Sequence, residues 1–85
     1  MPPVTIYTKS TCGYCLRAKA LLTRKNVRFE EISVDGNAAA QQAMAQRANG
    51  GWTVPQIFVG ETHVGGCDDL FALDRAGKLD ALLNA

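Results

Sequence analysis

Apolar residues in the first third of the chain follow two different periods. The segment Val4–Thr8 is β-branched and aromatic, which is the composition of a buried strand. Over Gly13–Lys25 the apolar residues Cys15, Ala18 and Leu22 recur at helical spacing, with basic residues on other faces and in the last turn. The pattern therefore predicts a buried strand followed by an amphipathic helix.

The middle of the chain continues with a strand and a second helix. Val27–Val34 predicts a strand, although its apolar phase shifts between Phe29 and Ile32, which a bulge would explain. Asp35–Asn37 is a turn signal. The Ala- and Gln-rich segment Ala38–Ala48 has almost no β-branched residue and predicts a helix, which ends at the Asn-Gly-Gly that follows.

The last third begins with a hairpin. Thr53–Val59 and Thr62–Val64 predict two short antiparallel strands around Gly60–Glu61. Asp68–Ala76 predicts a helix with acidic residues in its first turn and a glycine after its end. Leu79–Leu83 adds a final helical turn or two.

The order of these elements predicts an α/β fold on a four-stranded mixed sheet flanked by helices. A crossover helix makes the first two strands parallel, and the C-terminal pair forms an antiparallel hairpin. The chain has 85 residues, about half the typical length of one domain, so we expect a single domain over residues 1–85.

Charge and composition exclude several classes of function. Nine Lys and Arg against eight Asp and Glu give a formal net charge of +1, so no global field would attract nucleic acid or an anionic membrane. No apolar run is long enough to span a bilayer, and no secretory signal precedes the first strand. We expect a monomeric, cytoplasmic protein. In a reducing compartment, three cysteines point to redox or metal chemistry.

Two of the cysteines form a Cys-Gly-Tyr-Cys motif where the first strand meets the first helix. At this spacing the sulfurs of Cys12 and Cys15 can lie on one helix face, within disulfide reach. Unpaired N–H groups and the helix dipole stabilise a thiolate at Cys12, and Lys9 adds a nearby cation. We therefore expect Cys12 to be the nucleophile and Cys15, one turn further in, to be the shielded resolving thiol.

Two alternatives to a redox pair have less support from the sequence. A zinc site needs four ligands, and the remaining candidates, Cys67 and His63, do not form a second closely spaced pair. A purely structural pair of buried cysteines conflicts with the strand-to-helix position, which favours exposure. We predict a redox-active pair and no bound metal.

Two further motifs accompany the cysteine pair, Thr53–Pro55 and the segment Gly65–Asp69, which reads Gly-Gly-Cys-Asp-Asp. Together the three motifs resemble the dithiol class I glutaredoxins, particularly the small bacterial type, over nearly the whole chain. The resemblance implies a thioredoxin-like fold and a glutathione-dependent thiol-disulfide oxidoreductase. Such an enzyme reduces protein–glutathione mixed disulfides and protein disulfides, with glutathione reductase as an indirect partner. A protein served by thioredoxin reductase is disfavoured, because the Gly-Gly-Cys-Asp segment would have no evident role.

The resemblance also implies where glutathione binds. The bond before Pro55 is cis in the family, and the backbone of Val54 pairs with the cysteinyl backbone of glutathione. The γ-glutamyl carboxylate meets N–H groups at the start of the third helix, Asp68 or Asp69 accepts from the ligand ammonium, and the glycyl carboxylate faces a lysine. The full set of expected binding residues is Lys9, Tyr14, Thr53, Val54, Pro55, Cys67, Asp68 and Asp69.

Two positions depart from the family pattern. Many members have Pro at the position of Gly13, and some members without that Pro bind a [2Fe-2S] cluster between two subunits through the first cysteine and glutathione. A cluster carrier is therefore the alternative hypothesis, and the enzyme is favoured because Cys15 supplies a resolving thiol. Relatives often have a basic residue near Gly50–Trp52. Gln42 or Arg47 is the candidate to assist the lysine instead.

Several other residues have simpler explanations. The two acidic residues in the first turn of the third helix also complement the helix dipole. Cys67 is expected to be a small buried thiol that contributes its backbone rather than its sulfur. His63 is predicted to lie on a surface strand. Core positions are expected at Tyr7, Phe58 and Phe71, and a solvated helix face at Lys19, Arg24 and Lys25.

Overall fold

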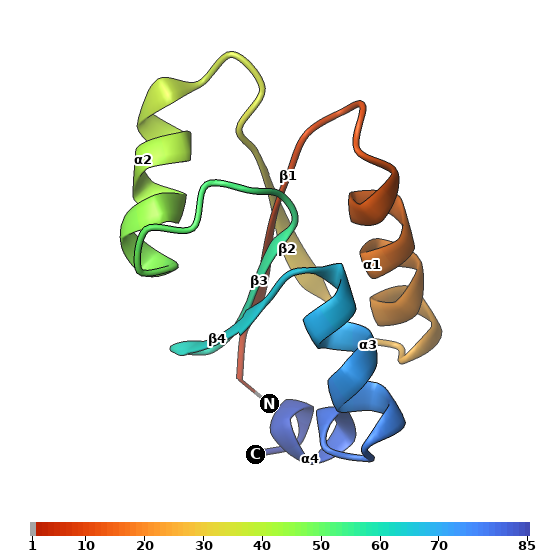
Figure 1. The fold of residues 1–85 in the computed structure, drawn as a ribbon. Coiled ribbons are helices and arrows are strands. Elements are labelled where there is room, and N and C mark those ends of the chain that lie inside the picture. The colour runs from red at the N-terminus through yellow and green to blue at the C-terminus, as the bar shows by residue number, and fades with distance from the viewer. Residues whose placement is uncertain (1) are drawn as a thin grey trace.

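The computed structural model describes residues 2–85, and its centre is a mixed sheet (Figure 1). The four strands lie in the order β2-β1-β3-β4. β1 (Val4–Thr8) runs parallel to β2 (Phe29–Ser33) and antiparallel to β3 (Gln56–Val59), which pairs antiparallel with β4 (Thr62–Gly65). The predicted four-stranded α/β arrangement, with one parallel pair and a C-terminal hairpin, is confirmed.

Four helices cover the two faces of this sheet unequally. α2 (Ala38–Arg47) lies alone on one side, whereas α1 (Gly13–Arg24) and α3 (Cys67–Arg75) lie on the other, with the short α4 (Leu79–Leu83) at its lower end (Figure 1). None of the helices among residues 2–85 is long and apolar enough to cross a membrane.

Each face of the sheet has its own apolar core. The larger cluster joins Ile6 of β1 to Leu22 of α1 and Leu70 of α3, all fully buried. The smaller cluster joins Tyr7 of β1 and Phe58 of β3 to Met44 of α2 and a few neighbours. Adjacent residues of β1 therefore serve opposite cores, as the period of two in a strand requires.

The second strand differs from its prediction in two ways. It begins at Phe29 rather than Val27, because Asn26 adopts φ 58° and the Val27 N–H bonds the carbonyl of Leu22 to close the end of α1. No bulge interrupts its register with β1. Phe29 packs against the larger core and Ile32 against the smaller one, so the phase shift reflects a strand that supplies both faces.

The third strand also begins later than predicted. Thr53 and Val54 form a bend before the cis bond to Pro55, and the ladder starts at Gln56. The hairpin that follows is confirmed, and it contains the irregularity that β2 lacks. Its register shifts between Ile57 and Phe58.

Three residues occupy different environments from those expected. Phe71 is only half-buried and lies beside the larger core with the guanidinium of Arg17 5.5 Å from its ring centroid. Lys19 and Lys25 are not simply solvated, because Lys19 pairs with Glu31 at 3.0 Å and Lys25 pairs with two aspartates of the C-terminal helices. Tyr7 and Phe58 are buried and Arg24 is exposed, as predicted.

Candidate functional site

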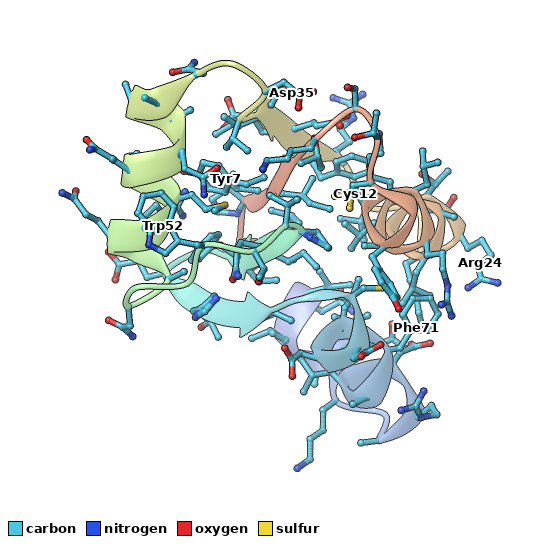
Figure 2. The ribbon with its side chains drawn as sticks, turned by 45° about the horizontal axis from the view of Figure 1, so that its top comes forward. Tyr7, Cys12, Arg24, Asp35, Trp52 and Phe71 are labelled. Carbon is cyan, nitrogen blue, oxygen red and sulfur yellow. The ribbon has the colours of Figure 1, made fainter. Side chains whose placement is uncertain are left out.

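Cys12 occupies the N-cap position of α1. Its backbone is extended, with φ −107° and ψ 107°, and its Sγ accepts a hydrogen bond from the Cys15 N–H at 3.1 Å. The side-chain oxygen of an N-cap Ser or Asp accepts the same hydrogen bond in other helices, and here the sulfur takes its place. The thiol is half-buried and lies beside the start of α1, on the side that faces the sheet (Figure 2). The structure therefore places a sulfur, partly open to solvent, against the positive end of a helix.

Cys15 lies one turn further along and is 1% exposed. Burial, followed by a hydrogen bond with the Cys12 side chain, raises the pKa of the Cys15 thiol to about 12, although the Lys9 backbone and the Lys19 charge act in the opposite direction. Both sulfurs are free thiols in this structure. At neutral pH Cys15 therefore holds its proton firmly, as expected of the shielded member of the pair.

A groove adjoins this helix end. It holds about 190 Å³ and lies between the bend before β3 and the start of α3. Its walls are Tyr14, Thr53, Val54, Pro55, Gly66, Cys67, Asp68 and Asp69. Seven of the eight expected binding residues are thus brought together from three separate parts of the chain. The bond before Pro55 is cis, as the resemblance implies.

A side-chain cap fixes the start of α3, which forms one wall of the groove. Asp69 Oδ2 accepts from the Gly66 N–H at 2.9 Å, which is one half of a capping box, since the glycine N-cap has no side chain. The N–H groups of the first helical turn, including those of Cys67 and Asp68, have no partner within the helix. Asp69 therefore caps α3 through Oδ2, and Asp68 adds a second exposed carboxylate to the same wall of the groove.

Cys67 is 4% exposed and packs in the larger core while forming part of the groove wall. Burial is the main cause that raises the pKa of its thiol, and the nearby Arg17 charge opposes the shift. This agrees with the predicted small buried thiol. Within residues 2–85, no three side chains among Cys, His, Asp and Glu come close enough together to hold a metal ion.

Lys9, which is expected to bind the glycyl carboxylate, does not line the groove, and neither do Gln42 and Arg47, the two alternative candidates to assist it. Lys9 is exposed. Hydrogen bonding from Ser10, whose N–H donates to Asp35 Oδ2 at 2.7 Å, is the main cause that lowers the pKa of Asp35, and the Lys9 charge acts in the same direction. Arg47 donates to Tyr7 Oη at 3.1 Å, and its guanidinium lies 4.2 Å from the centroid of the Phe58 ring. Gln42 is exposed on α2. The role of these side chains toward a carboxylate stays a prediction.

Gly66 belongs to the Gly65–Asp69 motif but was not among the expected binding residues, although it forms part of the wall of the groove. Its position immediately before the Cys67 helix start was the available signal, because the N-cap backbone borders any ligand at a helix N-terminus. His63 is exposed on β4, as predicted, yet it has a partner that the sequence did not reveal, because its Nε2 lies 2.7 Å from Gln56 Oε1.

Comparison with known proteins identifies the family. The family model described as Glutaredoxin matches residues 4–64. The chain is a member of the glutaredoxin family. Glutaredoxin from Pseudomonas aeruginosa is 64% identical over 85 residues and is covered completely, as is this chain. Glutaredoxin 3 from Escherichia coli is 59% identical, over 98% of this chain and 99% of that protein.

Solved glutaredoxin structures have the same fold. The buckwheat glutaredoxin–glutathione complex gives a TM-score of 0.87 at 36% identity, covering 98% of this chain and 77% of that one. The structure of glutaredoxin from Brucella melitensis gives a TM-score of 0.85 at 53% identity, and the match covers 98% of this chain and 89% of that one. Glutaredoxins are glutathione-dependent thiol-disulfide oxidoreductases, so this chain is an oxidoreductase of that class.

Proposed function

We propose that this glutaredoxin uses glutathione to reduce protein–glutathione mixed disulfides and protein disulfides, with Cys12 as nucleophile and Cys15 as resolving thiol. The observation that carries the proposal is the unequal environment of the two sulfurs. Cys12 caps α1 and is partly open, whereas Cys15 is buried beneath it with a pKa raised to about 12. This difference supports Cys12 as the thiol that attacks a disulfide first.

In the first reaction the Cys12 thiolate attacks the glutathione sulfur of a mixed disulfide. A bond forms between Cys12 Sγ and that sulfur, the bond to the protein sulfur breaks, and the departing protein thiolate takes a proton from solvent. A second glutathione thiolate then attacks the glutathione sulfur bound to Cys12. Oxidised glutathione leaves and the Cys12 thiolate is restored, so this route needs only one protein thiol.

In the second reaction Cys12 attacks a protein disulfide and becomes joined to the substrate. Cys15 loses its proton as it attacks Cys12 Sγ, which expels the substrate thiolate and leaves a Cys12–Cys15 disulfide. Two molecules of glutathione reduce this bond and become oxidised glutathione. The hydrogen bond from the Cys15 N–H to Cys12 Sγ supports the step, because it keeps the two residues adjacent at the helix start.

The groove is proposed to hold the glutathione moiety. In the family the residue before the cis proline pairs with the cysteinyl backbone, a role that falls to Val54 here. The γ-glutamyl carboxylate would accept from N–H groups of the first turn of α3, and Asp68 would accept from the ammonium. Tyr14 and Thr53 complete the lining. We assign the glycyl carboxylate to the exposed Lys9.

The test is reduction of a glutathionylated peptide by glutathione, coupled to glutathione reductase, for the metal-free wild type and for Cys12→Ser and Cys15→Ser. We expect Cys12→Ser to be inactive and Cys15→Ser to retain the mixed-disulfide reaction but to lose reduction of a protein disulfide. Retained protein-disulfide reduction in Cys15→Ser would refute the resolving role. An inactive wild type would refute the enzyme assignment and turn attention to the [2Fe-2S] alternative, which gains no support from the fold or the relatives.

A further inference from the structure

A buried polar side chain lies directly behind the groove. Gln56 begins β3 and is 6% exposed, although glutamine is mostly an exposed residue in proteins. Its side-chain amide contacts one side chain on β4 and another in the wall of the groove. Oε1 lies 2.7 Å from His63 Nε2 on β4, and Nε2 donates to Thr53 Oγ1 at 3.3 Å in the groove wall.

The chemistry of the three groups fixes the direction of both hydrogen bonds. An amide oxygen only accepts, so His63 must donate from Nε2–H to Gln56. The imidazole is held in place by its ring, which stacks on Phe58 with centroids 5.0 Å apart and planes 23° apart. With Oε1 committed to His63, the amide N–H of Gln56 points to Thr53.

The loop before Thr53 leaves the amide little freedom to move. A Cβ added at Gly51 would lie 3.1 Å from Gln56 Nε2 and 3.1 Å from Ala48 Cβ, which is tighter than ordinary packing. Glycine at this position therefore lets the loop close directly over the amide. The side chain is enclosed by the loop on one side and by the His63 hydrogen bond on the other.

We propose that Gln56 is a positioning residue for glutathione binding, fixed by His63 and acting through the Thr53 hydroxyl. Because Oγ1 already accepts from Gln56, the hydroxyl proton is the group left to be donated toward a ligand. Its acceptor is a carbonyl or carboxylate oxygen of the bound tripeptide. The inference rests on the proposed function, since it assumes that the groove holds glutathione.

The test is a double-mutant cycle on the glutathione-coupled reduction of a glutathionylated peptide. Gln56→Met keeps the volume and removes both hydrogen bonds, and Thr53→Val removes the hydroxyl. Each variant should raise KM for the peptide about three- to tenfold, the effect of one lost hydrogen bond, while kcat changes by less than about twofold. The double variant should bind no more weakly than Thr53→Val, because Gln56 then has no hydroxyl to orient.

A matched control separates this effect from simple anchoring of the loop. Gln41 of α2 donates to the Trp52 carbonyl at 2.9 Å, so Gln41→Met also releases one hydrogen bond to the same loop without touching the groove. Its KM should stay at the wild-type value. Equal KM increases in Gln41→Met and Gln56→Met, or additive effects in the double variant, would overturn the inference. An inactive wild type would instead overturn the proposed function.

A spectroscopic measurement keeps the inference testable if Gln56→Met unfolds. His63 is the single histidine of the chain, so its imidazole nitrogens are resolved without assignment. At a pH where the ring is neutral, the wild type should carry the proton on Nε2. Saturating glutathione should shift the Nε2 signal in the wild type but not in Thr53→Val. A proton on Nδ1, or equal shifts in both proteins, would contradict the relay from His63 through Gln56 to Thr53.

Discussion

The sulfur of Cys12 lies 3.8 Å from the carbonyl oxygen of Val54, the residue before the cis proline. The two residues are separated by 42 positions in the chain, and the fold brings the helix start against the bend before β3. A peptide that pairs with the Val54 backbone would therefore place its own sulfur close to the nucleophile.

Alkylation should distinguish the three thiols by burial. With limiting iodoacetamide at neutral pH, Cys12 should be modified first, because Cys15 and Cys67 are 1% and 4% exposed and their thiol pKa values are raised. Peptide mapping by mass spectrometry measures the order. In urea all three should react at similar rates. Labelling of Cys15 before Cys12 in the folded protein would contradict the assigned roles.

Alkaline pH should destabilise the protein through Cys15. Its pKa rises on folding from 9.0 to about 12, so the folded state keeps a proton that the unfolded state loses in this window. The stability that this group contributes is fully present below pH 9 and is lost as the pH rises toward 12. Urea unfolding across this range should show a shallower loss in Cys15→Ser, which has no ionising thiol there. Parallel pH profiles would exclude Cys15 as the cause.

Replacing Gly65 should damage the wall of the groove. Gly65 has φ +112°, and an added Cβ would lie 2.9 Å from the carboxyl carbon of Asp69, which caps α3. Gly77 also has a positive φ, +72°, but open space around it, so Gly77→Ala should cost only the backbone strain of about 1–2 kcal/mol. Gly65→Ala should cost about 1–3 kcal/mol more from overpacking. Thermal unfolding of both variants measures the difference.

Acid pH should reveal the hydrogen bond between Thr8 and Glu31. Thr8 donates to the carboxylate at 2.7 Å and is the main cause that lowers the pKa of Glu31, with Lys19 second. This stabilisation is present above the ordinary value of 4.5 and is lost as the pH falls below it. Thr8→Val should cost about 1 kcal/mol at neutral pH, a modest value because the carboxylate is 40% exposed.

The control for that prediction lies on the same strand. Thr5 is also buried in β1, at 9% exposure. Thr5→Val should therefore change the free energy of unfolding by an amount that does not depend on acid pH, whereas the cost of Thr8→Val should shrink below pH 4.5. A cost of Thr8→Val that persists unchanged in acid would show that Glu31 is not its partner in solution.

The sequence was sufficient to predict an element wherever the residues of one short segment determine its structure. The period of α1 and the composition of β1 predicted those elements directly, and the cysteine spacing predicted the placement of Cys12 at a helix start. The groove walls were expected from motif resemblance, because no local pattern shows that Thr53–Pro55 and Cys67–Asp69 meet in space.

The sequence predictions were wrong where a residue's environment depends on partners that are distant in the chain. The ion pair of Lys19 depends on Glu31 in another element, and that of Lys25 on α3 and α4, so helical spacing alone made both look solvated. The phase of β2 looked irregular because a one-dimensional pattern does not show that both faces of the sheet are covered. Gln56 reads as an ordinary strand residue until His63 is seen beside it.

The unequal covering of the sheet has a consequence for local opening. α2 is anchored on its face mainly by Met44 and Ala48, whereas α1, α3 and α4 share the larger core on the other face. We expect the amides of α2 to exchange with solvent through openings that leave α1 and α3 folded. Cys12 and Cys15 would then keep their positions at the start of α1 while α2 opens on the other face of the sheet. The amides of α2 should therefore exchange faster than those of α1 and α3.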